Sequence, residues 1–377
     1  MLHRITAPVA LMILLAAGSA RAQDAPPAPP DSAASTLESI EDLRQELNAA
    51  LADLSARLNE VRNRQSQASV DGVLFLRWSD DLKKTPGFNE FGVDRAYLNV
   101  RGSLNRRGVY RLTLDAERTT GERLFDYVKY AYDGVVFSPS ATVLLGMQQT
   151  PLVDFEEGIW KYRFVQKVLS DNEGKLTSSD LGLGAEGILN RKLAYKVLVS
   201  NGEGYKKAEA DRAKDLAGRL TYTVLPGLRL SAFANYGLID TSKARAASLV
   251  RHRYAALLSY EQPRYTVLAQ ALGAEDQSRS DAQRVQSGGV SLGGSWEAVS
   301  DWRLFGRFDM YDPDRLKPDN AHFRGLLGVS YAWGSNMVVA LSNQWTTYGA
   351  LATDKPTRPD GKTYNPNQVA LQVQVTY

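Results

Sequence analysis

The stretch NPNQVALQVQVTY, residues 365–377, ends the sequence. Val369, Leu371, Val373, Val375 and Tyr377 alternate in it with polar or small residues. Successive side chains of a strand point to opposite faces, so the alternation predicts a strand with one apolar and one polar face. An edge strand of a soluble sandwich is the weaker alternative. We expect this strand to pair with the first one, because a closed sheet leaves no free edge.

The same alternation recurs from Val70 onward. DRAYLNVRGSL (94–104) has Ala96, Leu98 and Val100 on one face and Arg95 on the other, and VYRLTLDAER (109–118) behaves alike. Many amphipathic strands of one sense indicate a transmembrane antiparallel β-barrel, an all-β fold, over residues 70–377. We predict about sixteen strands, or fourteen if two weak ones merge, near 70–79, 92–104, 109–118, 124–132, 141–149, 180–189, 193–201, 215–225, 228–237, 250–260, 265–273, 287–297, 302–311, 323–333, 337–346 and 367–377.

The predicted connections alternate in length. Short turns include 105–108, 226–227, 261–264, 298–301 and 334–336, whereas long polar loops include 80–91, 150–179, 202–214, 238–249, 274–286, 312–322 and 347–366. Outer-membrane barrels have short periplasmic turns and long external loops. The pattern therefore favours the bacterial outer membrane, with membrane lipid around the barrel and both chain ends in the periplasm. An aromatic last residue also fits the C-terminal recognition signal of such barrels.

The N-terminal segment reads as three parts. Residues 1–22 have a basic start, an apolar stretch and an Ala-Arg-Ala cleavage site, as in a secretory signal peptide. Residues 23–34 form a Pro/Ala-rich linker. Residues 35–66 begin with a capping box and carry about four heptads with mainly Leu, Ile and Val at the a and d positions, which predicts a periplasmic coiled coil. Arg44 interrupts this seam at an a position. A helix packed on the main domain is the alternative.

Composition limits the functions open to the chain. The sequence has no cysteine, and its formal charge of +3 falls to +1 without the signal peptide, so nothing favours nucleic acid. None of the usual hydrolase, zinc or phosphate-loop motifs is present, and we expect no cofactor, metal or catalytic residue. A barrel-embedded hydrolase built on His252 and Ser248 rests on spacing alone.

A barrel of about sixteen strands is too wide for side chains to fill, so its polar face should line water. Bases outnumber acids there about two to one, which favours anions. Pairing across the wall, for example of Arg111 with Asp115 or Arg307 with Asp309, would weaken that preference. The candidate pore-lining and anion-binding bases are Arg95, Arg101, Arg111, Lys129, Arg219, Arg253, Arg303 and Arg307.

The longest loop, residues 150–179, has apolar residues at helix-like spacing, including Phe155, Ile159 and Leu169. Such anchors predict that the loop folds into the lumen and narrows it. Its bases Lys161, Arg163 and Lys167 would then meet a solute at the constriction. A surface lid or a contact between protomers is the alternative.

Several segments, in order, resemble the phosphate-selective porin O and P family: DRAYLNVRGSL, YRLTLDAE, YVKYAY, LLGMQQTPL, SSDLGLGAEG, VSNGEGYKKAE, AGRLTYTVLPGLRL and GRFDMYDPD. The resemblance spans most of residues 70–377. It implies a sixteen-stranded, homotrimeric outer-membrane channel for phosphate, polyphosphate or other small anions. Lys129 stands where an acid is often expected, so the local charge pattern differs there.

Three functions follow as expectations. The leading one is a porin for passive diffusion of small hydrophilic solutes, chiefly anions such as phosphate. The second is a structural protein that tethers the outer membrane to the cell envelope through residues 37–65. The third is the barrel-embedded hydrolase.

Overall fold

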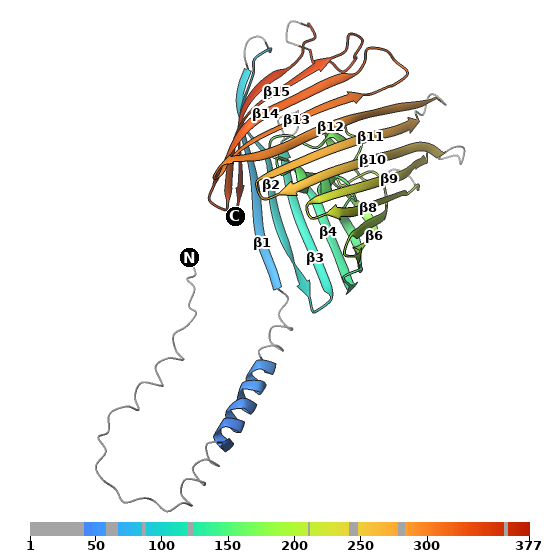
Figure 1. The fold of residues 1–377 in the computed structure, drawn as a ribbon. Coiled ribbons are helices and arrows are strands. Elements are labelled where there is room, and N and C mark those ends of the chain that lie inside the picture. The colour runs from blue at the N-terminus through green and yellow to red at the C-terminus, as the bar shows by residue number, and fades with distance from the viewer. Residues whose placement is uncertain are drawn as a thin grey trace, which may run out of the picture. The chain divides into compact units, whose positions relative to one another are not determined.

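The computed structural model describes residues 41–57, 67–84, 88–118, 124–209, 212–240, 248–277, 283–357 and 361–377. From residue 67 onward these residues form sixteen antiparallel strands in one closed barrel (Figure 1). The strands are β1 (Gln67–Asp81), β2 (Phe88–Leu104), β3 (Gly108–Arg118), β4 (Leu124–Ser138), β5 (Ala141–Gln149), β6 (Ser179–Asn190), β7 (Leu193–Ser200), β8 (Asp215–Leu225), β9 (Leu228–Asp240), β10 (Ser248–Gln262), β11 (Tyr265–Gln277), β12 (Arg284–Val299), β13 (Trp302–Asp312), β14 (His322–Trp333), β15 (Met337–Tyr348) and β16 (Asn367–Thr376).

The barrel closes where β16 pairs with β1, as the last stretch of sequence predicts. The register runs from Val73 opposite Thr376 to Asp81 opposite Gln368. At the end of the seam the backbones of Gly72 and Tyr377 exchange two hydrogen bonds, of 2.8 and 3.0 Å. The Tyr377 ring lies over Gly72, 2.3 Å from where a Cβ on that residue would be, so the last aromatic side chain packs on the seam.

Each predicted strand corresponds to one in the structure, and the count of sixteen is confirmed for the described residues. The largest difference is β4, which continues to Ser138 rather than ending near 132. Asp133 is exposed on the same outer face as Val135 and Phe137, and it interrupts the apolar alternation. Several strands also extend beyond their predicted ends, so the connection expected at 80–91 shortens to 82–87.

Connections of two or three residues alternate with longer ones along the described strands. In the turn after β2, Asn105 adopts a left-handed conformation, with φ of 61°, which asparagine tolerates better than most residues. Its side-chain Oδ1 accepts hydrogen bonds from the backbone N–H groups of Arg107 and Gly108, at 3.0 and 3.2 Å. Local side-chain bonding therefore specifies this short turn.

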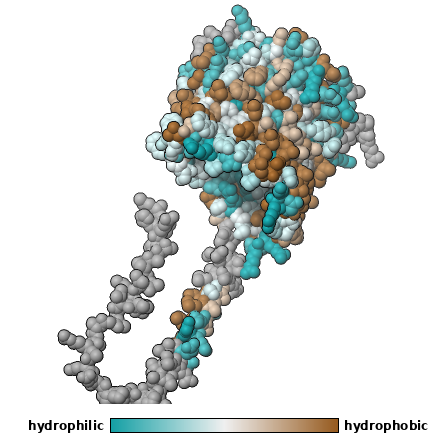
Figure 2. All heavy atoms as spheres, viewed as in Figure 1, coloured by the Kyte–Doolittle hydropathy of each residue, from teal (hydrophilic) through white to brown (hydrophobic). Residues whose placement is uncertain are grey.

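The two faces of the wall differ in polarity as the alternation predicts. Leu98, Leu112, Leu220 and Leu371 are exposed on the outside, and Figure 2 shows hydrophobic patches on the outer surface. The intervening residues face inward, and many are polar and buried, among them Asn99, Thr113, Asp115, Gln270 and Gln372. A greasy exterior and a polar interior are the reverse of a soluble sheet protein and typical of a membrane barrel.

The chain divides into two units, residues 1–64 and residues 65–377. The described part of the first unit is a helix over residues 41–57, in which Leu47, Leu51 and Leu54 are all exposed. The helical part of the predicted coiled coil is present in that range, while its association stays a prediction. No described helix is both long enough and apolar enough to span a membrane. The predicted signal peptide and linker lie outside the described residues.

Candidate functional site inside the barrel

The connection between β5 and β6, residues 150–178, folds into the barrel, as its apolar spacing predicts. It contains α2 (Val153–Trp160) and α3 (Leu169–Asn172). Tyr162 stacks on Phe305 of β13, with ring centroids 4.1 Å apart. The hydroxyl groups of Tyr162 and Ser330 are hydrogen-bonded at 3.0 Å. Since β13 and β14 lie far from β5 around the barrel, the loop crosses the interior.

Apolar side chains hold the loop against the wall. Leu152, Val153, Val168 and Leu169 are fully or almost fully buried, and they belong to one apolar cluster with wall residues such as Leu257. Burying a side chain of this size contributes about 1.5–3 kcal/mol. The wall adds polar anchors, because Gln372 of β16 donates its side-chain amide to the backbone carbonyls of Phe164 and Val165, at 3.3 and 3.0 Å. The loop is therefore a packed part of the barrel interior.

Glu156 of α2 is buried between the loop and β11. The Gln270 amide donates to its Oε2 at 3.0 Å, and the Ser170 hydroxyl donates to the same oxygen at 3.4 Å. Loss of hydration on burial raises the pKa of Glu156 to about 8, and Arg307 opposes that rise. This carboxyl is thus mostly protonated at neutral pH, which spares the protein an ionised group at a buried contact.

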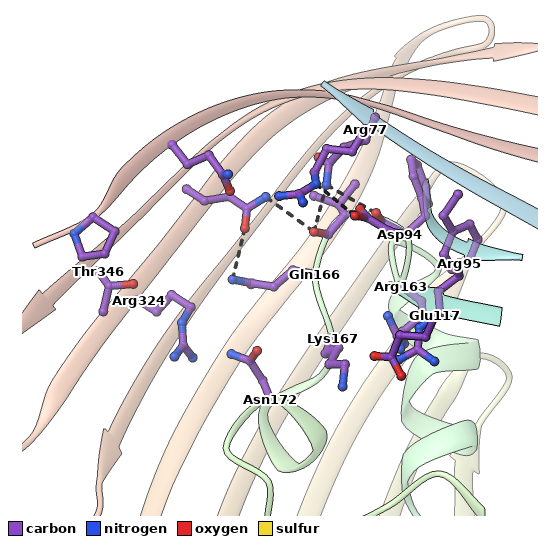
Figure 3. Close-up of a pocket in the computed structure, with 17 residues that line it drawn as sticks. Arg77, Asp94, Arg95, Glu117, Arg163, Gln166, Lys167, Asn172, Arg324 and Thr346 are labelled. Carbon is purple, nitrogen blue, oxygen red and sulfur yellow. Dashed lines mark hydrogen bonds and ion pairs between the residues drawn. The ribbon is translucent and has the colours of Figure 1, made fainter. Parts of the chain in front are cut away.

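A cavity of about 430 Å³ lies beside this loop inside the barrel. Its wall comes from β1, β2, β3, β14, β15, β16 and the loop. Its described lining holds five basic side chains, those of Arg77, Arg95, Arg163, Lys167 and Arg324, and two acidic ones, those of Asp94 and Glu117. Figure 3 shows these side chains around the space, together with the amides of Gln166 and Asn172. The lining is polar and carries a net positive charge.

Ion pairs hold most of these bases in place. Arg95 bonds to Asp115 at 2.6 Å and to Glu117 at 2.5 Å. Arg163 pairs with Glu157 at 2.5 Å, and Lys167 pairs with Asp171 at 3.2 Å. Asp115, Glu157 and Asp171 do not line the cavity, whereas Glu117 does. The side chains that line the cavity therefore include more cationic than anionic groups.

Three of the sequence-predicted bases, Arg95, Arg163 and Lys167, line this cavity. Arg307 lies beneath the loop, where it donates to the Lys167 carbonyl at 2.6 Å and pairs with Asp309 as expected, at 3.0 Å. The other paired bases are bound elsewhere along the interior: Arg101 to Asp71, Arg253 to Asp276, Arg303 to Glu297 and Lys161 to Glu261.

Arg111, Lys129 and Arg219 have no carboxylate ion pair within the described residues. Each lies instead on an aromatic ring: Arg111 is 4.2 Å from the centroid of Tyr130, Lys129 is 5.0 Å from that of Tyr97, and Arg219 is 3.7 Å from that of Phe155. Such contacts stabilise a cation without neutralising it. The suggested pair of Arg111 with Asp115 is wrong: Arg111 bonds to Thr113 at 3.0 Å, because Arg95 already occupies Asp115.

Two cavity bases, Arg77 and Arg324, were not among the sequence candidates. Arg77 bonds to Glu90 and Asp94, both at 3.0 Å, and Arg324 bonds to Glu173 at 2.7 Å. A signal was present, since each occupies an alternate position of its strand, two residues from the buried Phe75 or Leu326. Extending the alternation across β1 and β14 would have found both.

Nothing in the described part of the chain forms a metal-binding group of three or more His, Asp or Glu side chains. His252, the base considered for a hydrolase, alternates with the buried Arg253 and contacts the exposed outer residues Tyr236 and Tyr254, at centroid distances of 5.1 and 6.5 Å. It therefore lies on the outer face, away from the polar interior.

No family model and no curated protein sequence matches this chain. Solved structures are similar to it, however. An anion-selective porin from Comamonas acidovorans aligns at 11% identity with a TM-score of 0.65, over 83% of this chain and 100% of the porin. Outer-membrane expressed OmpT of Vibrio cholerae aligns at 13% identity and 0.60, over 82% and 97%. The outer membrane channel DcaP of Acinetobacter baumannii aligns at 12% and 0.58, over 83% and 97%. At these identities the likeness concerns the fold, and the fold of this chain is that of the sixteen-stranded outer-membrane porins.

Proposed function

We propose that this protein is an outer-membrane channel for passive diffusion of small hydrophilic solutes, with a preference for anions such as phosphate. The observation that carries the proposal is the cavity inside the barrel, whose described lining has five basic and two acidic side chains. The porin fold and the apolar outer wall support the membrane location, with lipid as the surrounding partner.

Electrostatics at short range makes this lining selective. Exposed charges act over roughly 8 Å at physiological ionic strength, so a solute beside the loop lies within reach of several bases at once. Their geometry is maintained by their ion pairs, and a moving anion does not have to order them. The resemblance to the phosphate-selective porins agrees with this preference. The Comamonas acidovorans porin of similar fold is itself described as anion-selective.

We further propose that three chains associate and that residues 37–65 take part in the association. The described part of that segment, residues 41–57, exposes Leu47, Leu51 and Leu54, which a partner helix would cover. A trimer form is described for OmpT of Vibrio cholerae, whose fold is similar. The helix would lie in the periplasm, where it is also available for contact with the envelope.

Planar-bilayer recording of the purified protein tests the channel. We expect stepwise conductance and, in a salt gradient, a reversal potential shifted toward anions. Lys167→Met should lower the anion-to-cation permeability ratio about twofold, because it removes one unit charge from the cavity lining. Lys317→Met, on an exposed loop outside the cavity, makes the same charge change and should leave the ratio nearly unaltered. A cation-selective wild type would contradict the proposed preference, and a barrel without conductance would favour the tether.

Deletion of residues 37–65 tests the association. Cross-linking in detergent should recover fewer trimers, while the shortened barrel keeps its conductance. An unchanged distribution of cross-linked species would show that the barrel alone governs oligomerisation.

A further inference from the structure

A second loop, between β7 and β8, extends to strands β2, β3 and β4. Its described residues are 201–209 and 212–214, and the Tyr205 hydroxyl donates to Oδ2 of Asp115 on β3 at 2.9 Å. The same hydroxyl accepts a hydrogen bond from Arg95 on β2 at 3.3 Å. The Tyr205 ring meets Tyr127 of β4 edge-on, with centroids 5.9 Å apart, and Lys206 forms an ion pair with Glu117. One loop thus contacts three neighbouring strands, β2, β3 and β4, that lie three to five strands from β7 around the barrel.

Two glycines before Tyr205 adopt backbone conformations that direct the loop toward these strands. Gly202 and Gly204 have φ of 95° and 75°, conformations that L side chains rarely adopt. The Gly202 N–H donates to Oδ2 of Asp180 at 2.7 Å. A Cβ on Gly204 would lie 2.6 Å from the side chain of Thr177, at the end of loop 150–178. The two inward loops therefore touch, and these contacts direct Tyr205 and Lys206 toward the wall.

The charges at this contact balance only when the loop is in place. The strands contribute Arg95 with two acids, Asp115 and Glu117, which leaves a net charge of −1. Lys206 supplies the missing positive charge. Arg95 and Glu117 both line the cavity and lie side by side beside Arg163 in Figure 3. An unbalanced acid at that place would repel an anion in the cavity.

We propose that Lys206, positioned by Tyr205, is a selectivity-determining residue of the channel. Lys206 neutralises Glu117. The β2–β3 side of the cavity then does not repel an anion that the bases of the loop and of β14 attract. The inference rests on the proposed function, which supplies the anion whose passage Lys206 favours. A purely mechanical role, in which the pair only holds the loop down, predicts a different outcome in the experiment below.

The test compares reversal potentials of single channels in a potassium chloride gradient. Lys206→Met should lower the anion-to-cation permeability ratio about threefold, because it leaves an uncompensated carboxylate, that of Glu117, in the cavity lining. The matched control is Lys214→Met. Lys214 lies in the same loop and pairs with Glu209 rather than with a wall residue. Lys214→Met should therefore change the anion-to-cation permeability ratio by much less than Lys206→Met does.

Glu117→Gln separates charge from mechanics. The double variant Lys206→Met/Glu117→Gln restores the balance, so its ratio should return to the wild-type value although the ion pair is still absent. Glu117→Gln alone should raise the ratio by about the same factor, which keeps the test informative if Lys206→Met fails to insert. Equal shifts in Lys206→Met and Lys214→Met, or no recovery in the double variant, would overturn the assignment. A wild type without conductance would instead reject the proposed function.

Discussion

The two loops that fold into the barrel are held in different ways. Loop 150–178 is anchored by buried apolar side chains, with Tyr162 stacked on Phe305 and Leu169 fully enclosed. Segment 201–209 is partly exposed and is anchored by polar contacts of Tyr205 and Lys206 with the wall. Burial of apolar area provides several kcal/mol, whereas a hydrogen bond provides about 1 kcal/mol net. The first loop is thus a permanent part of the interior and the second is the more readily displaced.

The largest expected effect is that of removing an apolar side chain that anchors loop 150–178. Tyr162→Ala should reduce the free energy of unfolding by about 3–5 kcal/mol, because it leaves a cavity against Phe305. Denaturant unfolding in detergent micelles, followed by tryptophan fluorescence, measures the loss. Channel recordings should show larger and noisier conductance. Tyr162→Phe keeps the stacked ring and should cost only about 1 kcal/mol, for its bond to Ser330. Similar losses in both variants would show that packing is not the anchor.

The second prediction concerns pH and Glu156. Its folded-state pKa of about 8 lies above the ordinary value of 4.5, so the folded protein binds the proton more tightly than the unfolded chain does. Stability should therefore be greatest below the ordinary value and fall as pH rises toward 8, by about 2 kcal/mol between pH 6 and 8.

Glu156→Gln replaces the protonated carboxyl by a neutral group of similar shape. The variant should lose most of this decline, and the difference from the wild type should grow as pH rises from 6 to 8. Glu209→Gln, at an exposed position of segment 201–209, is the control and should leave the decline unchanged. A wild-type profile that is flat over this range would contradict the assigned protonation.

The smallest expected effect concerns Tyr205 in segment 201–209. Tyr205→Phe removes the hydroxyl that donates a hydrogen bond to Asp115, and it keeps the ring against Tyr127. The free energy of unfolding should change by only about 1 kcal/mol. Hydrogen exchange should increase in residues 201–209 and stay unchanged in 150–178. Faster exchange in both segments would show that the loops unfold together.

Sequence reasoning captured the first loop and missed the second for a physical cause. An apolar residue such as Leu169 or Ile159 in a long loop needs a place to be buried, and the lumen is the available place. Tyr205 and Lys206 are common in solvated loops, so they carry no such requirement. Ion pairs within the wall have the same property. The alternation predicts correctly that Arg95 faces inward, but it does not show that Asp115 pairs with Arg95 rather than with Arg111.

Local sequence is sufficient to predict the barrel: the number of strands, their order and the face on which the wall side chains lie. Period-2 alternation encodes these features locally, because a membrane requires an apolar residue at every second position of a strand. Tertiary structure alone decided which bases meet which acids and which of them reach the cavity. Those contacts join residues as distant as Glu173 and Arg324, or Arg95 and Tyr205, and they depend on strand register and loop course. A buried charged side chain requires a partner of opposite charge, but the positions of the strands and loops in the closed barrel determine which residue that partner is.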